Sequence, residues 1–146
     1  MTDIARYVNT IFCEDVRHEL GGKVSFMGIY TGGSLIVPKE LPVVIPKLCA
    51  VVNAFTGIKD PFEKLSIVLY TDDIVSSQID IPEEKLTEVK QKGEENSDFS
   101  MIQIGVMFAL PGLFIEKPCI LRVEAKTERE VFLSAKLRIE FPPEPR

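Results

Sequence analysis

The sequence has no tryptophan, a single histidine and only three cysteines. Without tryptophan, it lacks the buried Trp that packs on the inter-sheet disulfide of antibody domains. The cysteines are odd in number and far apart, whereas secreted disulfide frameworks use an even, dense set. We therefore expect Cys13, Cys49 and Cys119 to be reduced side chains buried in apolar surroundings.

Long hydrophobic runs and an excess of basic residues are also missing. No stretch approaches the roughly 20 apolar residues that span a bilayer, so we expect no membrane partner. The first residues lack a basic region followed by an apolar core, which favours a cytoplasmic protein over a secreted one. The formal net charge is -5, and because phosphate backbones bind clustered Lys and Arg, we expect no nucleic-acid partner.

Residues that could carry chemistry are sparse. Cys13 and His18 could form a nucleophile and base, but Cys13 follows two apolar residues, and an apolar setting raises the pKa of a thiol. Three cysteines and one histidine could also bind zinc, yet no CxxC or HxxxH pair places two ligands on one turn. We predict no enzyme activity, no metal and no cofactor.

What the sequence does contain is a series of short β-prone runs separated by turn residues. The clearest is KLSIVLY at 64–70, with Leu65, Ile67 and Leu69 inward and Ser66 and Val68 outward. Further runs lie at 7–13, 24–30, 34–37, 47–55, 74–81, 99–108, 119–126 and 131–141. The pattern predicts an all-β, single-domain antiparallel β-sandwich with immunoglobulin-like architecture, with a closed barrel as the alternative.

We place the domain at 1–141, and three segments of the chain depart from the strand pattern. Residues 82–98 begin with Pro82 and two glutamates and contain Gly93 as a stop signal, which favours a short helix over a solvated loop. Residues 38–46 hold three prolines and predict an extended crossing segment or an edge strand. Residues 142–146 are rich in proline and are predicted to be a tail.

Two segments are candidate recognition surfaces. The first is a charged stretch between two predicted strands, followed by Gly21-Gly22, which favour a tight reversal. We interpret it as a polar turn with a structural or a recognition role, formed by Glu14, Asp15, Arg17, His18 and Glu19.

The second candidate surface is apolar and lies around a predicted Pro111-Gly112 turn. Apolar residues at a turn either pack over the open end of a sandwich or face a partner. If exposed, they would bind a protein partner or a second copy in a homodimer; they are Leu110, Leu113, Phe114 and Ile115, together with Phe62 in a nearby loop.

Several motifs together resemble a known family. They are FCEDVRHELGGKVSFMGIY, VIPKLCAVV, PFEKLSIVLYTDD, and an FxLPGLF turn followed by VEAKTE. This combination is similar to an uncharacterised family of small bacterial and prophage proteins that share the CEDVR…GK…GIY and PKLC motifs. The resemblance covers most of the chain outside 82–98 and implies a bacterial or phage-borne cytosolic protein. It implies no activity, cofactor or catalytic residue.

Three functions remain as hypotheses. The first is a non-enzymatic β-sandwich that acts through protein–protein contacts as a bacterial or phage accessory protein. The alternative is a small-molecule or carbohydrate-binding module, which requires a concave site lined by the available tyrosines, Tyr7, Tyr30 and Tyr70. The least favoured is a Cys/His enzyme or a metal protein.

Overall fold

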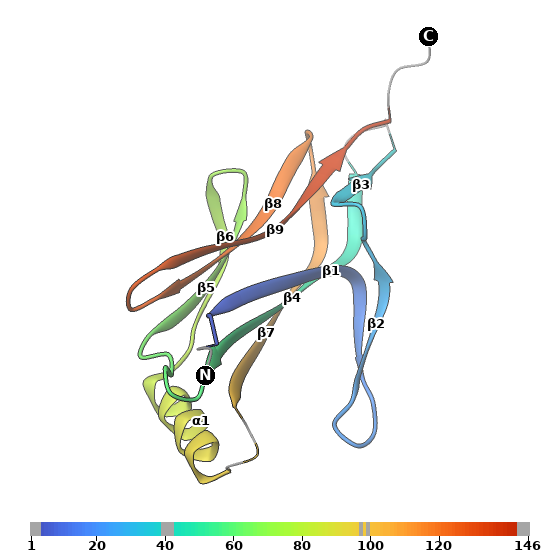
Figure 1. The fold of residues 1–146 in the computed structure, drawn as a ribbon. Helices are drawn as coiled ribbons and strands as arrows, with labels where there is room; N and C mark the ends of the chain where they lie inside the picture. The colour runs from blue at the N-terminus through green and yellow to red at the C-terminus, as the bar shows by residue number, and fades with distance from the viewer. Residues whose placement is uncertain (1–3, 39–42, 97, 99, 143–146) are drawn as a thin grey trace.

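The computed structural model describes residues 4–38, 43–96, 98 and 100–142, and its strands form two sheets (Figure 1). One sheet has the order β2-β1-β4-β7, and every pair in it is antiparallel. Its strands are β1 (Tyr7–His18), β2 (Val24–Ile29), β4 (Val43–Gly57) and β7 (Met101–Ile115). The predicted sandwich is therefore confirmed in preference to a barrel.

The second sheet has five strands in the order β3-β9-β8-β5-β6. It is formed by β3 (Ser34–Ile36), β5 (Leu65–Thr71), β6 (Ile74–Asp80), β8 (Cys119–Thr127) and β9 (Val131–Glu140). The β3–β9 pair is parallel and the other pairs are antiparallel. In the tight β8–β9 turn, the Thr127 N–H donates to the Glu130 carbonyl.

The core lies between the two sheets and is filled by alternate residues of the strands. In β4 the inward residues are Leu48, Ala50, Val52 and Ala54, which are at most 3% exposed. Leu65, Ile67 and Leu69 of β5 face inward as predicted. Val68 was predicted to point outward; it is buried on that side, where β6 and β8 flank its strand and Gln78 and Glu124 stand opposite it.

The segment 82–98 contains a helix, α1 (Glu83–Glu95), which confirms the helical alternative. Glu83 and Glu84 lie in its first turn, where carboxylates favour the helix dipole, and Leu86 is buried. Gly93 does not end the helix as predicted. A Cβ at Gly93 would lie 3.4 Å from Ile58 and 3.6 Å from Ile102, so the glycine allows close packing against them.

The charged stretch of β1 is not a turn, which corrects the sequence-based prediction. Residues 13–18 pair with β2, and the reversal lies at 19–23, where Gly21 and Gly22 have φ of 83° and 75°. The backbone ladder with β2 satisfies the main chain, so the polar side chains can lie along a strand. Figure 1 shows the β1–β2 hairpin projecting from the rest of its sheet.

The predicted Pro111-Gly112 turn is also wrong, because β7 continues through it to Ile115 in an unbroken register with β4. Gly112 has φ of 60°, a conformation that glycine adopts readily. The strand therefore continues past it, but the side chains that follow switch between the two sides of the sheet. Of the proline-rich segment, Val43–Pro46 begins β4, and residues 39–42 lie outside the described residues. There β4 pairs with β7 but not yet with β1, so Pro46 occupies an edge as proline requires. Of the predicted tail at 142–146, only residue 142 belongs to the described residues.

Candidate functional site

Of the two alternatives for the apolar residues around Pro111-Gly112, packing against the core holds for all but Phe114. Phe62 and Ile115 are 4% and 3% exposed, and Leu110 and Leu113 pack against the core. Phe114 is exposed, opposite the exposed Val44 of β4. The positive φ of Gly112 shifts the inward–outward alternation by one residue. Leu110 points inward before the glycine, and Leu113 and Ile115 point inward after it, which leaves Phe114 outward.

The polar residues of β1 are distributed along the hairpin. Asp15 accepts a hydrogen bond of 2.6 Å from Lys47, and this bond lowers the pKa of the Asp15 carboxyl. The ion pair joins β1 to β4 just beyond the point where the two strands separate. Arg17, His18 and Glu19 are exposed. Their recognition role stays a prediction.

The outer side of the four-stranded sheet carries a surface without charged residues, which we call the uncharged face. The strand registers place its side chains in four rows across the sheet. The rows are Tyr7–Phe55–Gln103, Asn9–Asn53–Gly105, Ile11–Val51–Met107 and Ile29–Cys13–Cys49–Ala109, and the two cysteines of the last row are fully buried. Met101 and Met27 extend the face at its two ends. In the next row, beyond Cys13 and Cys49, stand the paired charges of Asp15 and Lys47.

Within the uncharged face the side chains are ordered by contacts with one another. The rings of Tyr7 and Phe55 stack with centroids 4.4 Å apart. The Gln103 amide donates to the Asn53 side chain at 2.9 Å. Gly105 stands beside this amide pair, and a Cβ there would come within 2.9 Å of Asn53 Oδ1. The glycine therefore leaves room for Asn53 to lie flat across the sheet.

Methionine is concentrated on this face. Met27, Met101 and Met107 are 42%, 37% and 38% exposed, and they are all the methionines of the described residues. Methionine is enriched in protein interfaces, where its unbranched, polarizable side chain adapts to the partner. The combination of exposed methionines with an aromatic pair and no charge is typical of a contact surface.

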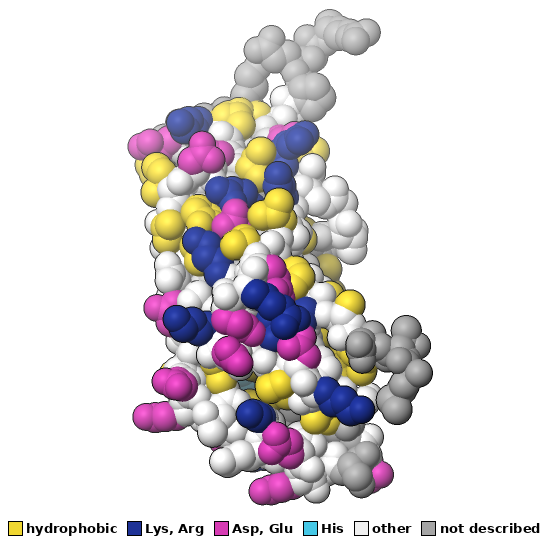
Figure 2. Space-filling model, turned by 60° about the vertical axis from the view of Figure 1, so that its left-hand side comes forward, with side chains coloured by type: hydrophobic (Ala, Val, Ile, Leu, Met, Phe, Trp, Pro, Cys, Tyr) yellow, Lys and Arg dark blue, Asp and Glu magenta, His cyan; other side chains and the backbone are white. Residues whose placement is uncertain are grey.

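The outer side of the five-stranded sheet has the opposite character. Arg122 lies over the ring of Tyr70 at 3.9 Å and pairs with Glu124. Further charged side chains of this side are Asp80, Lys126, Lys136 and Arg138. Figure 2 shows the side of the molecule on which β5, β6 and α1 lie, where hydrophobic side chains are interspersed with charges of both signs. The outer side of the five-stranded sheet is therefore charged, in contrast to the uncharged face of the four-stranded sheet.

Cys13 and His18 do not meet. Both belong to β1, where five residues of extended chain separate them by about 16 Å and place them on opposite sides. Cys13 lies directly opposite Cys49, and both are fully buried, which raises the pKa of each thiol. In the described part of the chain no group of three or more His, Cys, Asp or Glu side chains could hold a metal ion.

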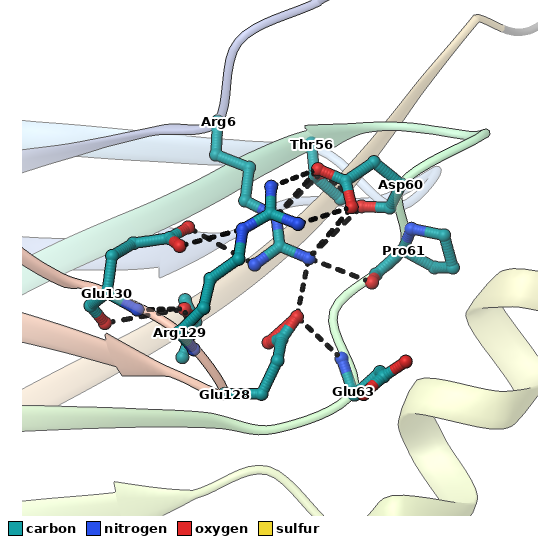
Figure 3. A network of polar contacts seen from close by, with 9 residues as sticks. Arg6, Thr56, Asp60, Pro61, Glu63, Glu128, Arg129 and Glu130 are labelled. Atoms are coloured by element: carbon teal, nitrogen blue, oxygen red, sulfur yellow. Dashed lines mark hydrogen bonds and ion pairs between the residues drawn. The ribbon is translucent and has the colours of Figure 1, made fainter.

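A network around Arg6 ties the two sheets together at one end of the sandwich (Figure 3). The Arg6 side chain is 3% exposed and reaches Glu128 at 2.6 Å, Glu130 at 3.2 Å and Asp60 at 3.3 Å. It also donates to the Pro61 carbonyl at 2.9 Å and lies over the Phe62 ring. Its partners come from the β4–β5 connection and the β8–β9 turn, so the network is a structural link between segments.

A cleft of about 520 Å³ opens where β1 and β4 separate. Tyr30, Glu14 and the Asp15–Lys47 pair line it, together with apolar residues of 35–38 and 43–46. Tyr7, by contrast, stacks on the uncharged face and Tyr70 lies under Arg122. The tyrosines therefore occupy three separate places and do not form one sugar-binding surface.

Comparison with known proteins gives no relative from which to transfer a function. No protein-family model matches the chain, and no curated protein is significantly similar to it. Among the described residues, no helix has both the length and the apolar character needed to cross a membrane.

Proposed function

We propose that the protein acts through protein–protein contacts, without catalysis, and that the uncharged face is its contact surface. The observation that carries this proposal is the difference between the two outer sides of the sandwich. One side mixes charges of both signs, and the other has none across residues 7–13, 49–57 and 101–109 of three adjacent strands. In a chain of which 27% is charged, such a face is a distinct feature of the fold.

The energetics of desolvation support a contact role for this face. Burying a charge is costly unless it finds a partner, whereas apolar surface gains roughly 25 cal/mol per Å² when water is removed. The exposed side chains of Tyr7, Ile29 and Met107 can therefore be covered at little polar cost. From the resemblance in sequence we further propose a bacterial or phage accessory role in the cytoplasm.

The proposal predicts that Met107→Lys abolishes binding of protein partners. Met107 lies in the middle of β7 on the uncharged face and is 38% exposed, so a lysine can be accommodated in the free protein. In a complex the ammonium would lose its hydration, which we expect to weaken binding about 100-fold or more. The measurement is affinity capture from a bacterial lysate with wild type and variant side by side.

Leu133→Lys is the matched control, because Leu133 is an exposed apolar residue of β9 outside the uncharged face. Partners lost with Met107→Lys and retained with Leu133→Lys would be assigned to the face. If all three proteins retain the same partners and the same state of association, the uncharged face is not the contact surface.

A further inference from the structure

We propose that the partner on the uncharged face is a second copy of this chain, so that two sandwiches pack face to face around a two-fold axis. This inference rests on the proposed function and names its partner. It draws on three properties of the face: its charge, its hydrogen-bonding groups and its area.

The absence of charge suits contact between identical surfaces. In a two-fold interface each copy presents the same patch to the other. A charge near the axis would therefore lie close to the identical charge of the second copy and repel it. The rows of the uncharged face contain none. At its rim Asp15 and Lys47 lie side by side. Each copy therefore offers a negative and a positive charge to the same two residues of the other copy.

The polar side chains of the face are also self-complementary. Asn9, Asn53 and Gln103 carry amides, and each amide has both a donor and an acceptor. Two identical amides can therefore pair with each other, which two lysines or two carboxylates cannot do. A second copy requires this property, because a group near the two-fold axis then faces its own kind.

The face is comparable in area with the smallest specific interfaces. The uncharged segments 49–57 and 101–109 are nine residues long and 7–13 is seven, and at a strand spacing of about 4.8 Å they cover roughly 400 Å² in plan. The accessible area is larger than the plan area because the side chains project from the sheet, and Ile29 and Met27 of β2 add to it. The sum approaches the roughly 500 Å² per copy that marks the lower limit of biological interfaces.

The same reasoning sets the salt dependence. Each copy carries a formal net charge of -5, so two copies repel each other at long range. The contact itself contains no ion pairs in its central rows, so salt screens the repulsion without weakening the interface. We therefore expect added sodium chloride to strengthen the dimer, whereas a contact held by ion pairs would weaken.

Sedimentation equilibrium of the full chain tests the proposal. Wild type and Leu133→Lys are expected to reach twice the monomer mass of 16.4 kDa, with affinity rising as salt is added. In Met107→Lys, two buried ammonium groups would be added per dimer, and we expect the Kd of the dimer to rise at least about 100-fold. A wild type that stays monomeric up to about 100 µM overturns the dimer. A dimer that survives in Met107→Lys overturns the assigned face.

A second measurement does not depend on the variant folding. Hydrogen peroxide converts exposed methionine to the sulfoxide, and peptide mapping gives the rate at each residue. Met101 and Met107 should be oxidised several-fold more slowly at dimer concentrations than in dilute monomer. Equal rates at both concentrations would refute the face-to-face dimer. If wild type is monomeric but Met107→Lys alone loses a lysate partner, the dimer fails while the proposed function stands.

Discussion

Arg6→Met is expected to lower the free energy of unfolding by about 3–5 kcal/mol, which is the range found when one partner of a buried ion pair is removed. Methionine keeps much of the length and packing of the arginine stem beside Phe62 but removes its charge. Glu128 and Glu130 would then lie near Asp60 with only Arg129 as a cation in the network that Figure 3 draws. Small domains have total stabilities of 5–15 kcal/mol, so the loss is large.

Urea unfolding followed by circular dichroism measures this loss as a shift of the midpoint at constant slope. Arg138→Met is the control, because Arg138 forms an ion pair with Glu140 that is exposed to solvent. Exposed pairs contribute about 0–1 kcal/mol, so this variant should remain close to wild type. A loss in Arg6→Met as small as that of the control would show that the network does not hold the sheets together.

The importance of Arg6 could not be predicted from the sequence, for a physical reason. Arg6 is separated from Asp60 by 54 residues and from Glu130 by 124 residues, and periodicity describes only neighbours along the chain. The contact exists because the β8–β9 turn and the β4–β5 connection reach the same end of the sandwich. Strand order sets this proximity, and the sequence pattern does not determine strand order.

The fold class, in contrast, follows from local patterns. The alternation in Leu65–Leu69 and the turn residues between short apolar runs are sufficient to predict an antiparallel sandwich. The limits of strands are less predictable, because ladders override composition. Residues 14–18 are polar, yet β2 pairs with them, and Pro111-Gly112 reads as a turn, yet β4 pairs across it.

The candidate site was predictable in part. Residues 7–13, 49–57 and 101–109 contain no charged residue, so neither side of these strands could carry charge. A strand with one solvent side normally alternates apolar and polar residues, and the missing charges are therefore a signal in the sequence itself. What the sequence does not reveal is that these three segments are neighbours, because β1, β4 and β7 are not consecutive strands.

Acid should destabilise the protein through Glu128, whose pKa lies at about 2 in the folded state. Burial alone would raise this pKa, but the hydrogen bond from Arg6, backbone N–H groups and the arginine charge lower it from the ordinary 4.5. A carboxyl with a depressed pKa binds a proton more readily when unfolded. Its contribution is therefore complete above about pH 5 and is lost as the pH falls toward 2.

The stability lost over this range through Glu128 should be about 3 kcal/mol. In Glu128→Gln the side chain no longer titrates, so the variant is expected to be less stable than wild type at pH 7 and nearly equal to it at pH 2. Urea unfolding at intervals between these pH values gives the difference directly. Glu88→Gln is the control, because its ion pair with Lys92 is exposed on α1, and its profile should follow that of wild type. Parallel profiles for wild type and Glu128→Gln would contradict the prediction, since they would mean that Glu128 binds its proton equally well in both states. Convergence at low pH would instead identify the Arg6–Glu128 pair as a principal acid-sensitive link between the two sheets.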